Sequence, residues 1–358
     1  MNDTDYLKGL LSDVIGSGPK SAEDMSYEQA REAFGRILDL DVDPTTLGAF
    51  LLANRWKRNS PTELAAFVDV MRTKSVVCYE PSTNPVDCGA NYDGKSKTAV
   101  IGIAAGLVAA TAGTPIVVHS GDAVPTKRGV AYKHVLEALN ISWDFTPKRS
   151  AAMVDEIGFG FYYQPRFNVA VNDLLDRREA MGVRTFINTI ETLANPSNAD
   201  VHVGSFYHLS FAKRIVDTVS ESRTLDFDRI IMVQGLEGYD DIRPGYTQIA
   251  EFRDNTLTDF GIETEAFGMD FTEADLAVTD VARDSAVITE GVLAGTRDDA
   301  FTAATALNAA LRLYAGGTVS DIDDGLALAR EILDDGRAIS LLDDLRAFES
   351  DPPQEPMR

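Results

Sequence analysis

Cysteine and histidine are scarce in this chain of 358 residues, which holds two cysteines, Cys78 and Cys88, and four histidines. Two cysteines cannot build a disulfide framework or a four-ligand zinc site. The histidines show none of the short spacings that place two imidazoles on one metal ion. G-x-S-x-G, P-loop and G-x-G-x-x-G motifs are also missing from the sequence. No enzyme class that depends on one of these motifs is indicated.

Long apolar runs are lacking as well. Residues 99–118 carry no charge, but three glycines and Pro115 interrupt the stretch, and its alanines are only mildly apolar. This pattern predicts a buried helix followed by a buried strand rather than a membrane span. The first residues also lack the basic-then-apolar pattern of a secretion signal. We therefore expect a cytoplasmic protein with no membrane partner.

Positive charge is the third scarcity. The chain has 33 Lys and Arg against 56 Asp and Glu, for a net charge of −23. Phosphate backbones are held by Lys and Arg, so this balance makes nucleic acid an unlikely general partner. Lysine supplies only 10 of the cations. An acidic, lysine-poor surface is typical of proteins from salt-loving organisms, where screening weakens self-repulsion.

The apolar residues that are present predict two domains. They make up 44% of the chain, enough for a sizeable core, and the length suits two domains. In residues 1–75 they recur at helical spacing. Ser26 with Gln29, and Ser60 with Glu63, form capping-box patterns at two of the helix starts. We expect a small all-α N-terminal domain over 1–75, joined by a helical segment near 165–182.

Strands and helices alternate over residues 76–350. A strand, a loop, an Ala-rich helix and a second strand predict a parallel pair with a right-handed crossover. The expected fold class is α/β, with a large domain whose mainly parallel central sheet is flanked by helices. The last residues, 351–358, are expected to form a disordered tail. The strands are expected at 85–88, 115–119, 201–206, 229–233 and 246–252, and the C-terminal helices at 280–293, 300–314, 321–334 and through Leu345.

The loop at 89–98 is the first candidate site. It joins a strand to a helix, and backbone N–H groups at such a place bind phosphate where glycine permits close approach. Lys95 and Lys97 lie in the loop, and the window 88–133 carries a net charge of +3 within this acidic chain. The pattern favours a polyphosphate ligand. Ordinary turns with solvated lysines are the alternative.

Two further loops follow predicted strands and are expected at the same edge of the sheet. In the loop at 119–129, a second phosphate clamp could come from Asp122, Thr126, Lys127 and Arg128. His119 alone is better explained as a hydrogen-bonded, partly buried histidine. In the loop at 235–241, the adjacent carboxylates Asp240 and Asp241 suit Mg²⁺ bound partly through ligand phosphates. A helix cap or solvated acids would explain the same pair.

Many segments together resemble one family. Their order and spacing are similar to those of the anthranilate phosphoribosyltransferase family, which is also grouped with pyrimidine nucleoside phosphorylases. The segment 235–241 resembles the family's Gly-x-x-Gly-Leu-Asp-Glu. The other segments that carry the resemblance are 47–52, 63–71, 158–161, Arg178, 182–188, 195–196, 307–316 and 324–329.

The resemblance implies transfer of the ribosyl group of phosphoribosyl pyrophosphate (PRPP) to the amine of anthranilate, as in tryptophan biosynthesis. It implies Mg²⁺ on the departing pyrophosphate, a small aromatic acceptor, and a homodimer joined through the helical domain. It also assigns roles by position: Gly89, Asp93 and Gly94 at the pyrophosphate, Asp240 and Asp241 at the metal, His119 on the acceptor side, Asn168 in place of an acceptor-side histidine, and Arg178 on an acceptor carboxylate.

The sequence departs from the family at the phosphate loop. Residues 89–94 read Gly-Ala-Asn-Tyr-Asp-Gly where the family has Gly-Thr-Gly-Gly-Asp-Gly, and the polar Asn-x-Ser-Thr falls near 100–103 without its polar groups. Cations and a hydroxyl are expected to replace them. An altered acceptor, as in the nucleoside phosphorylases, and a non-catalytic binder of nucleotides or single-stranded nucleic acid remain alternatives. The predicted replacement groups are Lys95, Lys97, Thr98, Lys127 and Arg128.

Overall fold

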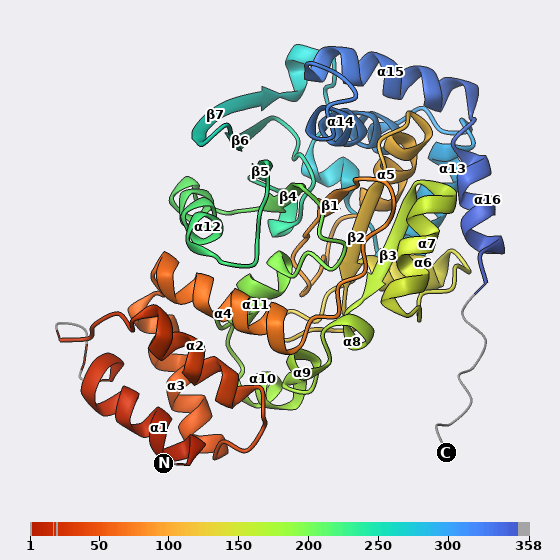
Figure 1. The fold of residues 1–358 in the computed structure, drawn as a ribbon. Helices are drawn as coiled ribbons and strands as arrows, with labels where there is room; N and C mark the ends of the chain where they lie inside the picture. The colour runs from red at the N-terminus through yellow and green to blue at the C-terminus, as the bar shows by residue number, and fades with distance from the viewer. Residues whose placement is uncertain (1, 17, 19–20, 350–358) are drawn as a thin grey trace, which may run out of the picture.

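The computed structural model describes residues 2–16, 18 and 21–349 (Figure 1). Four helices open the chain: α1 (Asp3–Leu10), α2 (Tyr27–Ile37), α3 (Pro44–Lys57) and α4 (Pro61–Lys74). Both predicted capping boxes are present, at Ser26 and at Ser60, where each hydroxyl accepts a hydrogen bond from the third helical amide. The tail expected at 351–358 lies outside the described residues.

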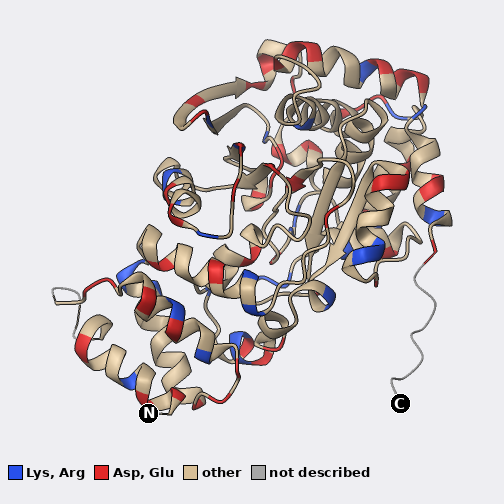
Figure 2. Cartoon of the chain, in the orientation of Figure 1, with Lys and Arg blue, Asp and Glu red and all other residues tan. Residues whose placement is uncertain are grey.

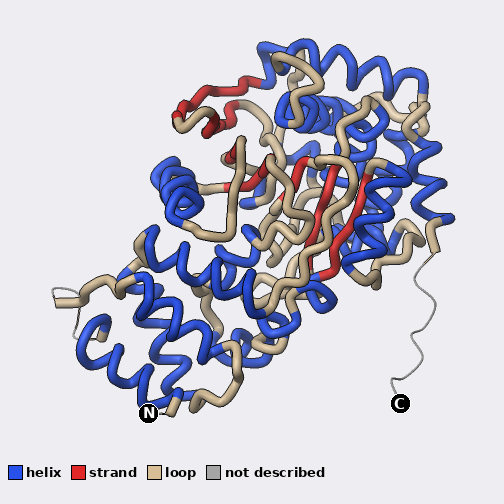
Figure 3. Tube along the Cα trace, in the orientation of Figure 1, coloured by secondary structure: helices blue, strands red, loops and turns tan. Residues whose placement is uncertain are grey.

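A seven-stranded sheet follows, with the spatial order β3-β2-β1-β4-β5-β6-β7. Its strands are drawn in red in Figure 3. The first five strands in this order pair in parallel, while β6 and β7 add an antiparallel hairpin at one edge. The strands are β1 (Val86–Cys88), β2 (Ile116–Ser120), β3 (Phe159–Tyr163), β4 (Val201–Ser205), β5 (Arg229–Val233), β6 (Tyr246–Arg253) and β7 (Thr256–Glu263).

Helices cover the sheet, so the predicted α/β fold class with its N-terminal helical domain is confirmed (Figure 1). The sequence analysis did not predict β3, β7, α6, α7, α11 or α12. The helices after the first strand are α5 (Gly102–Thr111), α6 (Tyr132–Ala138), α7 (Pro147–Ile157), α8 (Gln164–Phe167), α9 (Val169–Asn172), α10 (Leu175–Met181), α11 (Ile187–Ile190), α12 (Leu209–Glu221), α13 (Val281–Leu293), α14 (Ala300–Ala315), α15 (Ile322–Asp335) and α16 (Ile339–Ala347).

Alternate side chains of the strands build two cores, one on each face of the sheet. Val118, Phe161 and Ile231 pack with α5, α13 and α14. Val117 and Ile230 pack with the N-terminal helices and α12 on the other face. Strands buried on both faces are mostly apolar, which is why β2 begins with the apolar run 116–118 and β5 ends with the apolar run 230–233.

The stretch 99–118 forms the buried helix α5 and the start of the buried strand β2, as predicted. No helix within the described ranges has the length and apolar content needed to cross a membrane.

The strand order also locates the site. The chain passes from β1 to β2 on one side, while β4 pairs with the other side of β1. A crevice forms outside the carboxyl ends of parallel strands where the order reverses in this way. The loops after β1, β2, β4 and β5 all reach this edge.

Candidate functional site

The loops after β1 and β2 are joined by backbone hydrogen bonds. The Lys95 amide donates to Val130 O at 2.9 Å, and the Val130 amide returns a bond to Lys95 O at 2.7 Å. Gly94 has φ +75°, and a Cβ there would lie 2.6 Å from the Gly129 carbonyl carbon. Gly94 is therefore required by the contact between the two loops. The side-by-side arrangement of these loops was predicted, but the role of Gly94 is packing.

Gly89 is also explained by packing. A Cβ on Gly89 would lie 2.3 Å from Thr192 O and 2.5 Å from the His202 ring. The neighbouring Asp93 is almost fully buried, and its Oδ1 accepts a hydrogen bond from Arg184 Nη2 at 2.5 Å. These two residues hold the loop after β1 in place rather than presenting open groups to a pyrophosphate.

Glu237 enters the middle of this loop from the loop after β5. Its carboxylate accepts hydrogen bonds from the amides of Ser96 (3.0 Å), Lys97 (3.2 Å) and Thr98 (2.9 Å). The hydroxyls of Ser96 and Thr98 add bonds of 3.1 and 2.8 Å, and Lys127 Nζ lies 3.2 Å away. Burial opposes ionisation of Glu237, but these donors and Lys127 lower its pKa to about 2. We call this set of donors, on residues 96–98 and Lys127, the anion cradle.

The carboxylates predicted to bind a metal are already paired. Asp241 Oδ2 lies 2.5 Å from Lys95 Nζ, and Asp240 Oδ2 lies 2.9 Å from Arg312 Nη2. Tyr132 also donates its hydroxyl to Asp240 at 2.8 Å. All of these side chains are buried. Burial would lower the pKa of Arg312, but Asp240 and other neighbours raise it, so the guanidinium stays charged.

This arrangement places both predicted metal ligands, Asp240 and Asp241, in buried ion pairs. A buried carboxylate with its own cation cannot also coordinate Mg²⁺ without leaving that cation unpaired. Within the described ranges, no group of three or more His, Cys, Asp or Glu side chains could hold a metal ion. Lys95 likewise does not face a ligand, since its ammonium is used by Asp241 and by Ala99 O at 2.8 Å.

Arg178 does not face an acceptor either. Its Nη1 and Nη2 donate to the two carboxylate oxygens of Glu191, each at 2.7 Å. Arg178 is 2% exposed and Glu191 is fully buried. Both terminal nitrogens of the guanidinium are therefore bonded inside the protein, and the role of Arg178 on an acceptor carboxylate stays a prediction. Glu191, the first residue of the short helical turn Glu191–Leu193, supplies the partner.

His119 lies in the core, which agrees with the alternative prediction that it is a histidine without a role in the site. Its Nε2 is 3.1 Å from Asp87 Oδ1, and its Nδ1 bonds the Tyr92 hydroxyl. His202 Nδ1 contacts the other oxygen of Asp87 at 2.7 Å. Burial would raise the pKa of Asp87, but the two histidines hold it below its ordinary value. This network links the central strands β2, β1 and β4.

The remaining predicted residues do not converge on one cleft. Arg128 is exposed and pairs with Glu179 at 2.6 Å, whereas the side chain of Lys97 is exposed and only its amide joins the anion cradle. Asn168 is buried, and its Oδ1 accepts a hydrogen bond from Ser75 at 2.6 Å. Of the predicted substrate-binding residues, only Lys97, Thr98 and Lys127 contribute to the cradle.

A cavity of about 280 Å³ opens beside the cradle, at the carboxyl edge of the sheet. It has two arginines, several hydroxyls and amides, and an aromatic wall. The sequence analysis did not single these residues out, although Arg184 and Asn188 lie in the segment 182–188 that carries the family resemblance. The lining residues are Arg55, Asn91, Arg184, Thr185, Asn188, Thr189, Thr192, Ser205, Phe206, Tyr207, His208, Phe211 and Gly238.

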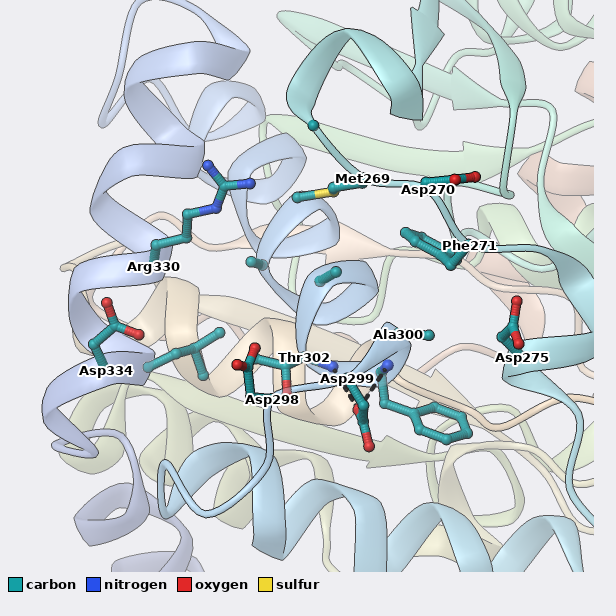
Figure 4. A pocket seen from close by; sticks show the side chains of 15 residues that line it. Met269, Asp270, Phe271, Asp275, Asp298, Asp299, Ala300, Thr302, Arg330 and Asp334 are labelled. Carbon is teal, nitrogen blue, oxygen red and sulfur yellow. Dashed lines mark hydrogen bonds between the residues drawn. The ribbon is translucent and has the colours of Figure 1, made fainter.

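A larger hollow of about 680 Å³ lies between α14, α15 and the segment 268–275 (Figure 4). Its lining is strongly acidic and includes Asp270, Asp298 and Asp334. Asp299 caps α14 by accepting from the Phe301 and Thr302 amides. An acidic hollow of this kind repels phosphate, so it is a poor candidate for the substrate site. Asp and Glu residues are also spread over the helices of the described part of the chain (Figure 2).

The Arg178–Glu191 pair generates the first prediction. Arg178→Ala should lower the free energy of unfolding by about 3–5 kcal/mol, because it leaves the Glu191 charge buried and unpaired. Arg177→Ala, an exposed neighbour on the same helix, should change it by less than about 0.5 kcal/mol. Denaturant unfolding measures both. Unchanged stability of Arg178→Ala, with a selective loss of turnover, would restore Arg178 to the acceptor site.

The paired carboxylates generate the second prediction. Mn²⁺ alone should show no saturable binding below about 1 mM to the ligand-free protein, since Asp240 and Asp241 already hold cations. Electron paramagnetic resonance of free Mn²⁺ measures this directly. Binding of one Mn²⁺ per chain that disappears in Asp241→Asn would show that the metal displaces Lys95, and Asp241 would then be a metal ligand, as the resemblance implies.

Comparison with known proteins agrees with the fold and with the two parts of the chain. Residues 6–75 match the description "Glycosyl transferase family, helical bundle domain", and residues 87–339 match "Glycosyl transferase family, a/b domain". In sequence, the anthranilate phosphoribosyltransferase of Methanocorpusculum labreanum is 32% identical over 91% of this chain and 94% of its own. That of Methanosarcina barkeri is 32% identical over 93% of this chain and 89% of its own.

Solved structures share the fold. Anthranilate phosphoribosyltransferase from Thermus thermophilus superposes with a TM-score of 0.79 at 24% identity, covering 96% of this chain and 99% of that one. The Saccharomyces cerevisiae protein in complex with PRPP and Mg gives a TM-score of 0.79 at 18% identity, covering 96% and 98%. The family descriptions and relatives above 30% identity extend along most of the sequence: the chain belongs to the anthranilate phosphoribosyltransferase family of glycosyl transferases.

Proposed function

We propose that this chain transfers a phosphoribosyl group from PRPP to an aromatic amine such as anthranilate, a step of tryptophan biosynthesis. The observation that carries the proposal is the cavity at the carboxyl edge of the sheet, within a chain of this family. The cavity lies at the point where the strand order reverses, which is where α/β domains bind their ligands.

The lining suits an acceptor with an anionic group and a flat ring. Arg55 and Arg184 supply guanidinium groups, which bind carboxylates in a planar, bidentate geometry. Phe206, Tyr207 and Phe211 supply aromatic surface. Arg184 is fixed by Asp93, and Arg55 Nη1 donates to Arg184 O at 2.5 Å. The two cations are therefore held together at one wall, and they replace Arg178 in the proposed acceptor site.

The chemistry proposed for this site is positioning and electrostatics. Cys88 is fully buried, and burial raises its thiol pKa to about 12, so it does not serve as a nucleophile. Transfer to an amine needs the two reactants aligned and the departing pyrophosphate neutralised. The chain supplies donors for the pyrophosphate at the anion cradle and cations for the acceptor at Arg55 and Arg184.

Mg²⁺ enters the proposal only as part of the substrate. A yeast relative has been solved with PRPP and Mg. In this chain Asp240 and Asp241 do not fit a resident metal, because Arg312 and Lys95 occupy them. We therefore keep the predicted Mg²⁺ as the counter-ion that PRPP carries, and we assign it no protein ligand.

The proposed acceptor wall generates the third prediction. Arg55→Ala and Arg184→Ala should each lower kcat/KM for anthranilate about 10- to 100-fold, since a partly desolvated carboxylate contact is lost. The KM for PRPP should change little in Arg55→Ala, which leaves the Asp93 contact intact. Steady-state kinetics with product detection by mass spectrometry measures these values, with Arg177→Ala as the matched surface control.

Other outcomes of that assay would redirect the proposal. A loss below about threefold in both variants would remove anthranilate as the acceptor. Turnover of a nucleoside with phosphate, and none of PRPP with anthranilate, would favour the phosphorylase-like alternative. Binding of nucleotides or single-stranded nucleic acid without any turnover would favour the non-catalytic alternative.

We also propose a homodimer joined through the helical domain, residues 1–75 with 165–182, in the cytoplasm of a salt-loving organism. The apolar residues Phe50, Phe67 and Val68 are fully buried within one chain and do not form the interface. Leu52 and Trp56, one turn apart on α3, are exposed at 41% and 78%. An exposed apolar pair of this size on one helix face supports an interface there.

Light scattering supplies the fourth prediction. At micromolar concentration and high salt, the wild-type chain should have the mass of a dimer, and Trp56→Glu should have that of a monomer, because a charge is then buried at the interface. Circular dichroism should show the same helix content for both. A monomer mass for the wild type would refute the dimer.

A further inference from the structure

The anion cradle is built for more acceptor atoms than Glu237 provides. Five hydrogen-bond donors from residues 96–98 converge on the two carboxylate oxygens, and Lys127 adds an ammonium at 3.2 Å. A carboxylate offers about four lone-pair sites, so it cannot satisfy all of these groups well. A phosphoryl group has three free oxygens and at least as much charge, and it matches such a set of donors better.

Glu237 is also held in an unfavourable backbone conformation. It has φ +56°, and the following Gly238 has φ +78°, so two successive residues are left-handed. A non-glycine residue in this region carries a steric cost. The turn is short, spanning Leu236–Gly238, and the bonds from the carboxylate to the cradle oppose its relaxation.

The cradle is accessible, and it adjoins the cavity. Ser96 and Lys97 are exposed, and the side chain of Lys127 is 28% exposed, so a solute anion can reach the rim. Gly238, the residue after Glu237, lines the cavity. The turn that carries Glu237 therefore lies between the cavity and the cradle. Movement of this turn would join the two into one site.

We propose that the cradle is a phosphoryl subsite which Glu237 fills in the ligand-free chain and vacates when a diphosphate binds. Glu237 is then an intrachain competitor of the diphosphate, and its release opens the cradle towards the cavity. This inference rests on the proposed function for the identity of the ligand as a diphosphate. We call this occupation of the cradle by Glu237 the latch. The latch rests on the contacts of Glu237 alone.

The test is binding of inorganic pyrophosphate by isothermal titration calorimetry, without divalent metal and at constant salt. Glu237→Gln keeps the shape of the side chain and removes its charge, so pyrophosphate should bind at least about tenfold more tightly than to the wild type. Adding Thr98→Val to Glu237→Gln should remove most of the gain, because a cradle donor is lost. Glu237→Ala is the second variant if the amide variant does not fold.

Glu179→Gln is the matched control. It removes one negative charge from the exposed partner of Arg128 and leaves the cradle untouched, so its affinity for pyrophosphate should stay within about twofold of the wild type. Equal binding by Glu237→Gln, Glu237→Ala and the wild type would overturn the latch, while turnover of PRPP by the wild type would leave the proposed function standing. No binding of pyrophosphate or PRPP by any of these proteins would overturn both.

Discussion

Buried carboxylates with internal partners hold the carboxyl edge of this sheet together. A charge removed from water is tolerated only when a partner and hydrogen bonds replace its hydration. Three buried ion pairs do this: Asp240 with Arg312, Asp241 with Lys95, and Glu191 with Arg178. These pairs connect the loops after β1 and β5 with α10, α14 and the 191–193 turn. The shape of the site depends on them.

The same pairing decides which groups are left for a ligand. Lys95, Arg178 and Arg312 are buried together with the acids that they neutralise, so they are not available to a phosphate or an acceptor carboxylate. Arg184 also pairs with a buried acid, Asp93, but its own side chain is 33% exposed. Arg55 and Arg184 remain at the wall of the cavity. The donors of residues 96–98 are bonded to Glu237, whose neighbour Gly238 lines the cavity. The site proposed for this chain is built from these groups, which differ from those that the motifs indicated.

The fold was predictable because its signals are local. Capping boxes at Ser26 and Ser60, and apolar periodicity, identified the N-terminal helices. Strands buried on both faces are mostly apolar, as in β5, where an apolar run fills 230–233. The strand β7 was not predicted because most of its residues are exposed, so its sequence lacks the regular alternation of apolar and polar residues that indicates a strand. The strand β3 carries Gly160, whose lack of a side chain lets Val154 of α7 approach the backbone, and this contact is invisible in the sequence.

The sequence by itself determined the fold class, the family and the position of three loops at the carboxyl edge of the sheet. Each of these depends on residue types and on their spacing along the chain. Tertiary structure alone decided how the charges pair. Lys95 and Asp241 are 146 residues apart, and Ser96 and Glu237 are 141 apart. Electrostatic energy depends on the distance between side chains and on their burial, and neither is encoded in separation along the chain. A lysine in a loop therefore looks like a ligand for phosphate until its carboxylate partner is brought beside it by the fold.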